Sequence, residues 1–353
     1  MTGTVGQVRA DVEEAGRWLT RRVVRTPVLR SPVIDELAGA RVLLKAENLQ
    51  HGGSYKMRGA LRAVGRLAMA GHTGVIAQST GNHAVAVALA ARQHGLAATV
   101  VLPVDAASTK VDRARAAGAR VVFAGTSVEE RVAVANGLSD ESGHPVVDAY
   151  DHPDVIAGQG TASLELIEDA ERAGTPLDAL VVPVGGGGGV AGACLAAAGS
   201  GIEVYGVEPV GCDSLARSLA AGVRVPVAPT PTIADGLRPS CVGELPFAIV
   251  RDTLRGVVRV DDDEIAAAFR LILTELKVLA EPSGAAGLAG ALRLPPAGAS
   301  RRLPPAGGGR SASAIDRQRT VGVVLTGGNV EAALVARLMA SRSADLAEEG
   351  VAA

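Results

Sequence analysis

Lys56 stands in a setting that can turn a lysine side chain into a nucleophile. The apolar run at residues 42–45 predicts a buried strand before it, and the loop Gly52-Gly53-Ser54 leads towards it. Burial disfavours the charged ammonium form and lowers its pKa, which leaves a neutral, reactive amine. An isolated lysine is usually a solvated surface charge, so we single out Lys56 for its apolar surroundings and its glycine-bearing loop.

A second candidate is the loop at residues 79–83, Ser-Thr-Gly-Asn-His. It lies between a predicted strand at residues 74–77 and a predicted helix at residues 84–93. A tight turn at a helix N-terminus directs several backbone N–H groups outward, where they can bind an anion. Capping of the helix by Ser79 or Thr80 is the structural alternative. Capping and anion binding are compatible, so both interpretations stay open.

Two further turns repeat the pattern of strand, turn and helix. Five glycines at residues 185–189 lie between a predicted strand at 180–184 and a predicted helix at 190–198. Without Cβ atoms their backbone can wrap around a phosphate, and the helix dipole favours its negative charge. Near the end of the chain, a predicted strand at 321–325 is followed by Thr-Gly-Gly-Asn at 326–329.

The glycine run also fits a different kind of site. Gly187, Gly189 and Gly192 satisfy the GxGxxG pattern of dinucleotide-binding folds, and Glu208 ends the next predicted strand about 20 residues later. A dinucleotide site would not account for Lys56 or for the loops at residues 79–83 and 326–329. NAD binding therefore stays as the alternative interpretation.

With these strings the chain resembles the fold type II pyridoxal 5'-phosphate (PLP) enzymes, the tryptophan synthase β-like group, and within it the serine/threonine dehydratases and serine racemases. The resemblance runs from about residue 26 to residue 340, and Ser-Tyr-Lys-Met-Arg-Gly-Ala at 54–60 is its most specific part. It implies that PLP is attached to the Lys56 amine, with its phosphate on the five glycines. The implied cofactor-binding residues are Lys56, Asn82, Gly185, Gly186, Gly187, Gly188, Gly189 and Thr326.

The same resemblance places the substrate carboxylate against the loop at residues 79–83. The implied substrate-binding residues are Ser54, Ser79, Thr80, Gly81, Asn82 and His83. Many dehydratases of this group have alanine at the position of Thr80, whereas serine racemases have a serine that acts on the opposite face of the cofactor. The candidate catalytic residues are therefore Lys56, as cofactor anchor and base, and Thr80.

The resemblance also implies the reaction. Thr326 would bind the pyridine nitrogen through a neutral hydroxyl, which makes the ring a weaker electron sink and favours rapid loss of a β-leaving group. We expect an ammonia-lyase that performs α,β-elimination on a small β-hydroxy amino acid such as L-threonine or L-serine, giving a 2-oxo acid and ammonia. The alternative is a racemase of serine or a related amino acid, or another β-eliminating or β-replacing PLP enzyme.

Some members of the group carry a cation site, and this chain keeps only part of it. The corresponding residues are Glu208 and the carbonyl of Cys212, whereas Ser214 stands where the relatives have an acid. Glu208 and Cys212 are thus the candidate ligands of a divalent or monovalent cation.

The arrangement of apolar runs predicts an α/β fold. Eight short strands, among them 99–102, 120–124, 204–208 and 257–260, alternate with helical stretches, which is typical of parallel sheets. The resemblance implies two open, twisted, mostly parallel sheets flanked by helices, with PLP in the cleft between two domains. The large PLP-binding domain would span residues 1–65 and 150–353, with a flexible arginine-rich insertion at 295–320, and the small domain residues 66–149.

The bulk composition favours a small-molecule enzyme. Lys and Arg (35) nearly balance Asp and Glu (37), so no strong field attracts nucleic acid or an anionic membrane. No apolar run approaches the ~18 residues of a membrane span, and the acidic N-terminus lacks a secretory signal. We expect a cytoplasmic protein whose partners are a small amino acid substrate and, from the resemblance, a second copy in a homodimer.

Overall fold

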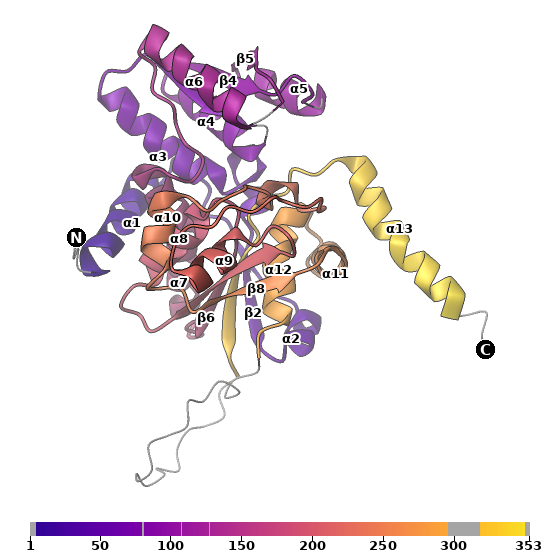
Figure 1. Ribbon diagram of the computed structural model, residues 1–353. Helices are drawn as coiled ribbons and strands as arrows, with labels where there is room; N and C mark the ends of the chain where they lie inside the picture. The colour runs from indigo at the N-terminus through magenta and orange to yellow at the C-terminus, as the bar shows by residue number, and fades with distance from the viewer. Residues whose placement is uncertain (1–4, 80, 107, 127, 296–317, 350–353) are drawn as a thin grey trace.

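The computed structural model describes residues 5–79, 81–106, 108–126, 128–295 and 318–349. These residues form two lobes, a smaller one of purple segments and a larger one of mainly red and orange segments (Figure 1). Each lobe is built around its own sheet. The chain therefore has the two-sheet α/β architecture that the sequence predicts, whereas the domain limits at residues 65 and 150 stay a prediction.

The larger sheet consists of β1 (Val28–Leu29), β2 (Arg41–Lys45), β6 (Ala179–Pro183), β7 (Glu203–Pro209), β8 (Gly256–Val260) and β9 (Thr320–Val324). Their order is β1-β2-β9-β6-β7-β8, and only the edge strand β1 runs antiparallel to its neighbour. Alternate residues of β6 pack into different cores, since Leu180 and Val182 belong to one cluster and Val181 to another. Both faces of the sheet are thus covered, which explains the continuous apolar runs.

Helices cover the two faces of the larger sheet. They are α1 (Val5–Leu19), α2 (Pro32–Ala38), α7 (Pro153–Arg172), α8 (Gly188–Ala197), α9 (Ser214–Ala221), α10 (Glu244–Val250), α11 (Asp262–Leu271) and α12 (Pro282–Leu292). Helix α13 (Ala332–Glu349) contacts α11 and extends away from the larger lobe (Figure 1). Helices α7 and α8 cross in close contact, because a Cβ at Gly192 would lie 2.6 Å from the backbone nitrogen of Gly160. This crossing fixes the start of α8, where the five-glycine turn lies.

The smaller sheet is entirely parallel, in the order β3 (Gly74–Gln78), β4 (Ala97–Leu102) and β5 (Arg120–Phe123). It is accompanied by α3 (Lys56–Met69), α4 (Asn82–Gln93), α5 (Ser108–Ala116) and α6 (Val128–Ser142). Helix α3 packs against both α4 and α7, so it joins the two lobes. Lys56 is the first residue of this connecting helix.

All eight predicted strands are present, and only the two-residue strand β1 was missed. The predicted insertion at residues 295–320 ends too late, because Thr320 is the buried first residue of β9; residues 296–317 lie outside the described part of the chain. Helix α11 is capped by Asp261 and changes at Ile272 to a π-helical turn, which Lys277 ends at φ 60°. Among the described residues no helix is long and apolar enough to cross a membrane.

Candidate active site

Two glycines bend the chain between β2 and α3 and bring Lys56 to the centre of the molecule. Gly52 and Gly53 have φ angles of 70° and 74°, a region that favours glycine. The turn is tied to the loop at residues 326–329, because the Tyr55 N–H donates to the Thr326 carbonyl (3.0 Å) and the Gly328 N–H to the Gly53 carbonyl (3.0 Å). The predicted Lys56 and Thr326 segments therefore lie side by side.

The Lys56 amine lies in a half-buried position and forms no ion pair with the carboxylates of the described residues. Its Nζ donates to the carbonyl oxygen of Ala149 at 2.8 Å. Burial lowers the pKa of Lys56 to about 8, and the nearby charge of Asp148 opposes this shift in part. At pH 7 such a pKa leaves roughly one amine in ten neutral, against about one in a few thousand for a free lysine. The predicted nucleophilic setting of Lys56 is present.

The five-glycine turn leaves a set of backbone donors free. Within the described chain, the N–H groups of Gly186, Gly187, Gly188 and Gly189 form no hydrogen bond. They lie at the N-terminus of α8, where the helix dipole adds to their attraction for an anion. Side chains approach this turn closely: a Cβ at Gly186 would overlap the ring of Tyr150, and one at Gly189 would lie 2.9 Å from the Tyr55 hydroxyl. The turn thus has the donors and the glycines that a phosphate group needs.

One short segment connects Lys56 to the glycine turn. Ala149 accepts a hydrogen bond from Lys56 and a second from the Gln159 side chain (3.2 Å), while the ring of Tyr150 lies against Gly186. The Asp148 carboxylate fixes this segment by accepting from the Tyr150 N–H at 2.8 Å. The amine and the phosphate-binding turn accordingly flank the same two residues.

Asn82 lies in a partly buried polar network with Glu281 and Asn329. Its Nδ2 donates to Glu281 Oε1 (2.7 Å), and its Oδ1 accepts from Asn329 Nδ2 (2.8 Å). Asn329 Nδ2 also donates to the carbonyl of Gly52 (2.8 Å), which links the network to the Lys56 turn. Burial, aided by the charge of Asp235, raises the pKa of Glu281 to about 8. The network orients the Asn82 side chain relative to the Lys56 loop.

The other residues of the loop at 79–83 have different surroundings. Of the two residues considered as alternative caps for α4, Ser79 does not cap it: Gly81 is the N-cap residue, and the Ser79 hydroxyl accepts from the N–H of Gly81 (3.3 Å). His83 is buried and donates from Nε2 to the Val147 carbonyl (2.8 Å). Burial and the nearby Lys56 charge lower the pKa of His83 to about 4, so its ring is neutral. Thr80 lies outside the described residues.

Ser54 and Thr326 are both buried at the junction of the two loops. Ser54 forms an isolated antiparallel bridge with Gly327, and Thr326 follows directly after β9. A Cβ at Gly327 would overlap Glu281 Oε1, so this turn passes tightly over the Asn82 network. Ser54, Lys56, Asn82 and Thr326 therefore belong to one cluster, together with the glycine turn.

Glu208 and Cys212 do not meet a complete set of metal ligands. Glu208 is fully buried, and its two oxygens accept from the N–H groups of Leu215 (2.8 Å) and Ala216 (2.9 Å). Burial raises the pKa of Glu208 to about 7. Across the described residues no three His, Cys, Asp or Glu side chains group as a metal site. The candidate cation site therefore has no support from the side-chain geometry.

The hydrogen bonds of Glu208 also argue against the dinucleotide interpretation. Glu208 would have to bind a ribose hydroxyl, but both its oxygens are occupied by backbone N–H groups. Gly192, the third glycine of the pattern, serves the contact between α7 and α8. The free N–H groups of residues 186–189 therefore fit one phosphate group and do not by themselves indicate a dinucleotide.

Sequence reasoning missed the segment Ala149–Tyr150 and the partnership of Glu281 with Asn82. Asp148 and the Asp151-His152-Pro153 string signal a turn before α7, but they do not reveal what the turn contacts. Glu281 directly precedes α12, and nothing in its sequence surroundings indicates a partner in α4. Only the folded chain shows it 2.7 Å from the Asn82 amide.

Comparisons with known proteins agree with this geometry. The sequence profile described as "Pyridoxal-phosphate dependent enzyme" matches residues 19–302. The chain is 38% identical to an L-threo-3-hydroxyaspartate ammonia-lyase of Pseudomonas sp (93% of this chain, 97% of the relative). It is 36% identical to a serine racemase of Oryza sativa subsp. indica, with 91% and 90% covered. The crystal structure of the threonine deaminase of T.th. superposes with a TM-score of 0.81 at 40% identity, covering 91% of this chain and 98% of that one.

The match extends over most of the chain and includes every segment of the cluster up to Glu281. The free donors of the glycine turn and the half-buried amine of Lys56 fit the phosphate and the aldehyde of PLP, which explains why these two features lie together. The chain belongs to the pyridoxal-phosphate dependent enzyme family, in the group of serine and threonine dehydratases and serine racemases.

Proposed function

We propose that this protein is a PLP-dependent ammonia-lyase that eliminates the β-hydroxyl group of a small amino acid. The observation that carries the proposal is the half-buried Lys56 amine, with its lowered pKa. It contacts the same short segment, Ala149–Tyr150, as the glycine turn with its free N–H groups. The relatives named as ammonia-lyases support the elimination chemistry.

Lys56 has two tasks in the proposed reaction. It holds the cofactor through its amine and, once the amino group of the substrate has displaced it, it removes the proton from Cα. When bound, PLP supplies the electron sink for the charge that develops at Cα. The lowered pKa of Lys56 favours both tasks, because each needs the neutral amine.

The surrounding residues orient cofactor and substrate. The N–H groups at the start of α8 would hold the phosphate, while the Asn82 side chain and the Thr326 hydroxyl would hold the ring. Ser79, Gly81 and the start of α4 would bind the substrate carboxylate, with Thr80 adjacent. Backbone N–H groups here would fix the Cα–H bond towards the Lys56 amine.

The atoms of the reaction balance without a further reagent. The Cα–H and Cβ–O bonds break, the proton from Cα passes to Lys56, and Lys56 returns a proton to the leaving hydroxyl group, which departs as water. The resulting enamine is hydrolysed to a 2-oxo acid and ammonia. The β-substituent distinguishes L-serine, L-threonine and L-threo-3-hydroxyaspartate, and the Pseudomonas and Saccharomyces cerevisiae relatives are named for the last of these.

A racemase is the second candidate, because serine racemases of rice and other organisms match over 91% of this chain or more. Racemisation needs a group that returns a proton to the opposite face of Cα, and Thr80 is the residue in sequence position to do so. We also propose a homodimer, on the strength of the family resemblance, which light scattering of the purified protein can test. A cytoplasmic location likewise stays a prediction.

A substrate panel tests the proposal. Purified enzyme with PLP is incubated with L-serine, L-threonine and L-threo-3-hydroxyaspartate, and 2-oxo acid, ammonia and D-enantiomer are measured. We expect equal amounts of 2-oxo acid and ammonia from at least one substrate. A D-enantiomer that forms faster than the 2-oxo acid moves the assignment to the racemase, and no turnover of any substrate contradicts both.

A further inference from the structure

The junction of β7 with α9 holds two buried carboxyl groups. Glu208, near the end of β7, uses both oxygens to accept the N–H groups of Leu215 and Ala216 at the start of α9. Asp213 is 3% exposed and lies directly before the same helix. Buried carboxylates need nearby positive charge or hydrogen-bond donors to be tolerated.

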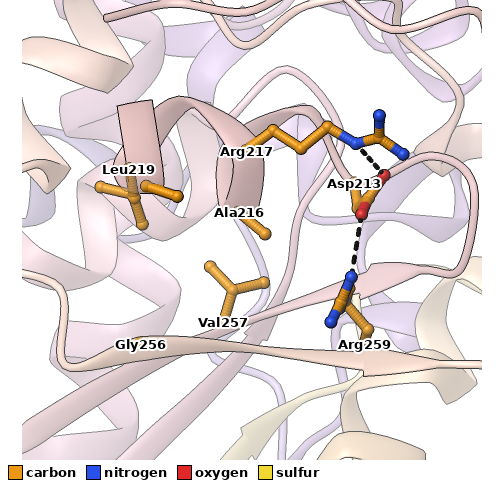
Figure 2. A pocket seen from close by; sticks show the side chains of 8 residues that line it. Asp213, Ala216, Arg217, Leu219, Gly256, Val257 and Arg259 are labelled. Atoms are coloured by element: carbon orange, nitrogen blue, oxygen red, sulfur yellow. Dashed lines mark hydrogen bonds and ion pairs between the residues drawn. The ribbon is translucent and has the colours of Figure 1, made fainter. Parts of the chain in front are cut away.

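Two arginines supply that positive charge from the protein itself. Arg217 Nε lies 2.9 Å from Asp213 Oδ1, and Arg259 Nη1 lies 3.3 Å from Asp213 Oδ2. Figure 2 shows the two guanidinium groups on separate sides of Asp213, at the rim of a surface pocket of about 390 Å³ between α9 and β8. Asp213 thus has both of its oxygens paired.

Arg259 also faces Glu208. The two residues are Cα partners in the parallel ladder of β7 and β8, and side chains in register on neighbouring strands point to the same face. The positive charge of Arg259 acts on the Glu208 carboxyl as well as on Asp213. A single guanidinium group therefore serves both buried acids.

We propose that Arg259 is a built-in cation at this junction, so that the protein needs no inorganic cation there for stability or turnover. Mg²⁺ and Ca²⁺ require about six to eight oxygen ligands. Here the oxygens of Glu208 accept N–H groups, those of Asp213 accept guanidinium groups, and Ser214 offers a hydroxyl instead of a third acid.

Removal of the Arg259 charge should therefore destabilise the junction of β7 with α9. In Arg259→Gln the buried Asp213 would keep only Arg217, and Glu208 would lose the positive charge opposite it. Asp213 is buried, but the Arg259 side chain is 61% exposed, so solvent screens this pair and its loss should lower stability only moderately. Arg251→Gln is the matched control, because Arg251 is similarly exposed and pairs only with its exposed neighbour Asp252.

The test measures melting temperature and metal content of the holoenzyme. The protein is freed of metal with EDTA and transferred at equal ionic strength into tetramethylammonium chloride, KCl, MgCl₂ or CaCl₂. We expect the wild-type melting temperature to agree across the four salts within about 1 °C, with no stoichiometric metal by mass spectrometry. In tetramethylammonium chloride, Arg259→Gln should melt roughly 2–4 °C lower and Arg251→Gln should match the wild type.

Two outcomes would overturn the proposal. One is a wild-type protein that retains about one equivalent of metal, or that melts more than roughly 3 °C higher with one of the metal cations. The other is an Arg259→Gln variant as stable as Arg251→Gln. Neither readout depends on the substrate or on the elimination reaction, so failure here is distinct from failure of the proposed function.

Discussion

The starts of α8 and α9 are two versions of the same structural unit with opposite uses. Both helices follow neighbouring parallel strands, β6 and β7, and both begin at the same edge of the larger sheet. At α8 the N–H groups of residues 186–189 are free, whereas at α9 the N–H groups of Leu215 and Ala216 are bound by Glu208. The start of α8 can therefore bind a ligand, whereas the start of α9 is already occupied by the Glu208 carboxyl group of the preceding strand.

Lys45 and Lys56 show a similar contrast. Lys45 is completely buried and pairs with Glu165 at 2.7 Å, so a carboxylate stabilises its charged form. Lys56 donates to a carbonyl oxygen, which gives its ammonium form less support, and its pKa falls to about 8. Reactivity thus depends on what the amine is paired with as much as on its burial.

Replacement of Lys56 should have the largest effect. In Lys56→Arg the positive charge stays, but no amine remains to hold the cofactor or take the Cα proton. We expect turnover to fall by about 10⁴-fold or more in a 2-oxo acid assay. The exposed Lys277→Arg variant serves as control and should keep wild-type activity; retention of activity in Lys56→Arg would remove Lys56 from the mechanism.

A substitution at the start of α8, where the N–H groups are free, should have the next largest effect. In Gly186→Ala the new methyl group would overlap the Tyr150 ring and shift the turn, with a loss of one or two hydrogen bonds to a charged phosphate. We expect PLP affinity to fall by about 10- to 100-fold in an absorbance titration. In the control Gly256→Ala no atom lies within 4 Å of the added Cβ, and its PLP affinity should be that of the wild type.

A substitution at the start of α9, where Glu208 accepts the N–H groups, should alter stability instead. In Glu208→Gln one of the two N–H groups of α9 would meet an amide NH₂ in place of an oxygen. We expect a loss of about 1–3 kcal/mol in the free energy of unfolding, measured in urea. The exposed Glu171→Gln variant should lose almost nothing. Equal stability of the two variants would show that Glu208 does not hold the start of α9.

The Glu281 carboxyl should affect how stability depends on pH. Its folded pKa of about 8 lies above the ordinary value of 4.5, so the folded state binds this proton more tightly. That contribution to stability is complete below about pH 4.5 and is lost as the pH rises to about 8. Glu281→Gln should flatten this decline in melting temperature between pH 5 and 8, and an unchanged slope would contradict the raised pKa.

The sequence was sufficient for the fold and for much of the site. Continuous Val and Leu runs predicted all eight longer strands, because strands covered on both faces need apolar side chains throughout. Strand–glycine–helix strings predicted the loops around Lys56, Asn82, the five glycines and Thr326, since such turns carry their conformational requirements in their own residues.

The remaining features depend on contacts between distant parts of the chain. Lys56 meets the carbonyl of Ala149, 93 residues later, and Asn82 meets Glu281, 199 residues later. No local pattern encodes either pair. Ser79 does not cap α4 for a local reason: Gly81 takes the N-cap position, and the hydroxyl binds one residue ahead of the helix.

Mapping the lysine to which PLP attaches tests directly whether Lys56 holds the cofactor. The chain has four lysines, at positions 45, 56, 110 and 277, so a borohydride-reduced, PLP-labelled peptide identifies the site by mass spectrometry. Apoenzyme is mixed with PLP between pH 6 and pH 10 and reduced after a fixed short time. We expect the label on Lys56, and we expect the amount of label to rise with pH through a midpoint near 8. Label on another lysine, or labelling that rises only near pH 10.5, would contradict this expectation.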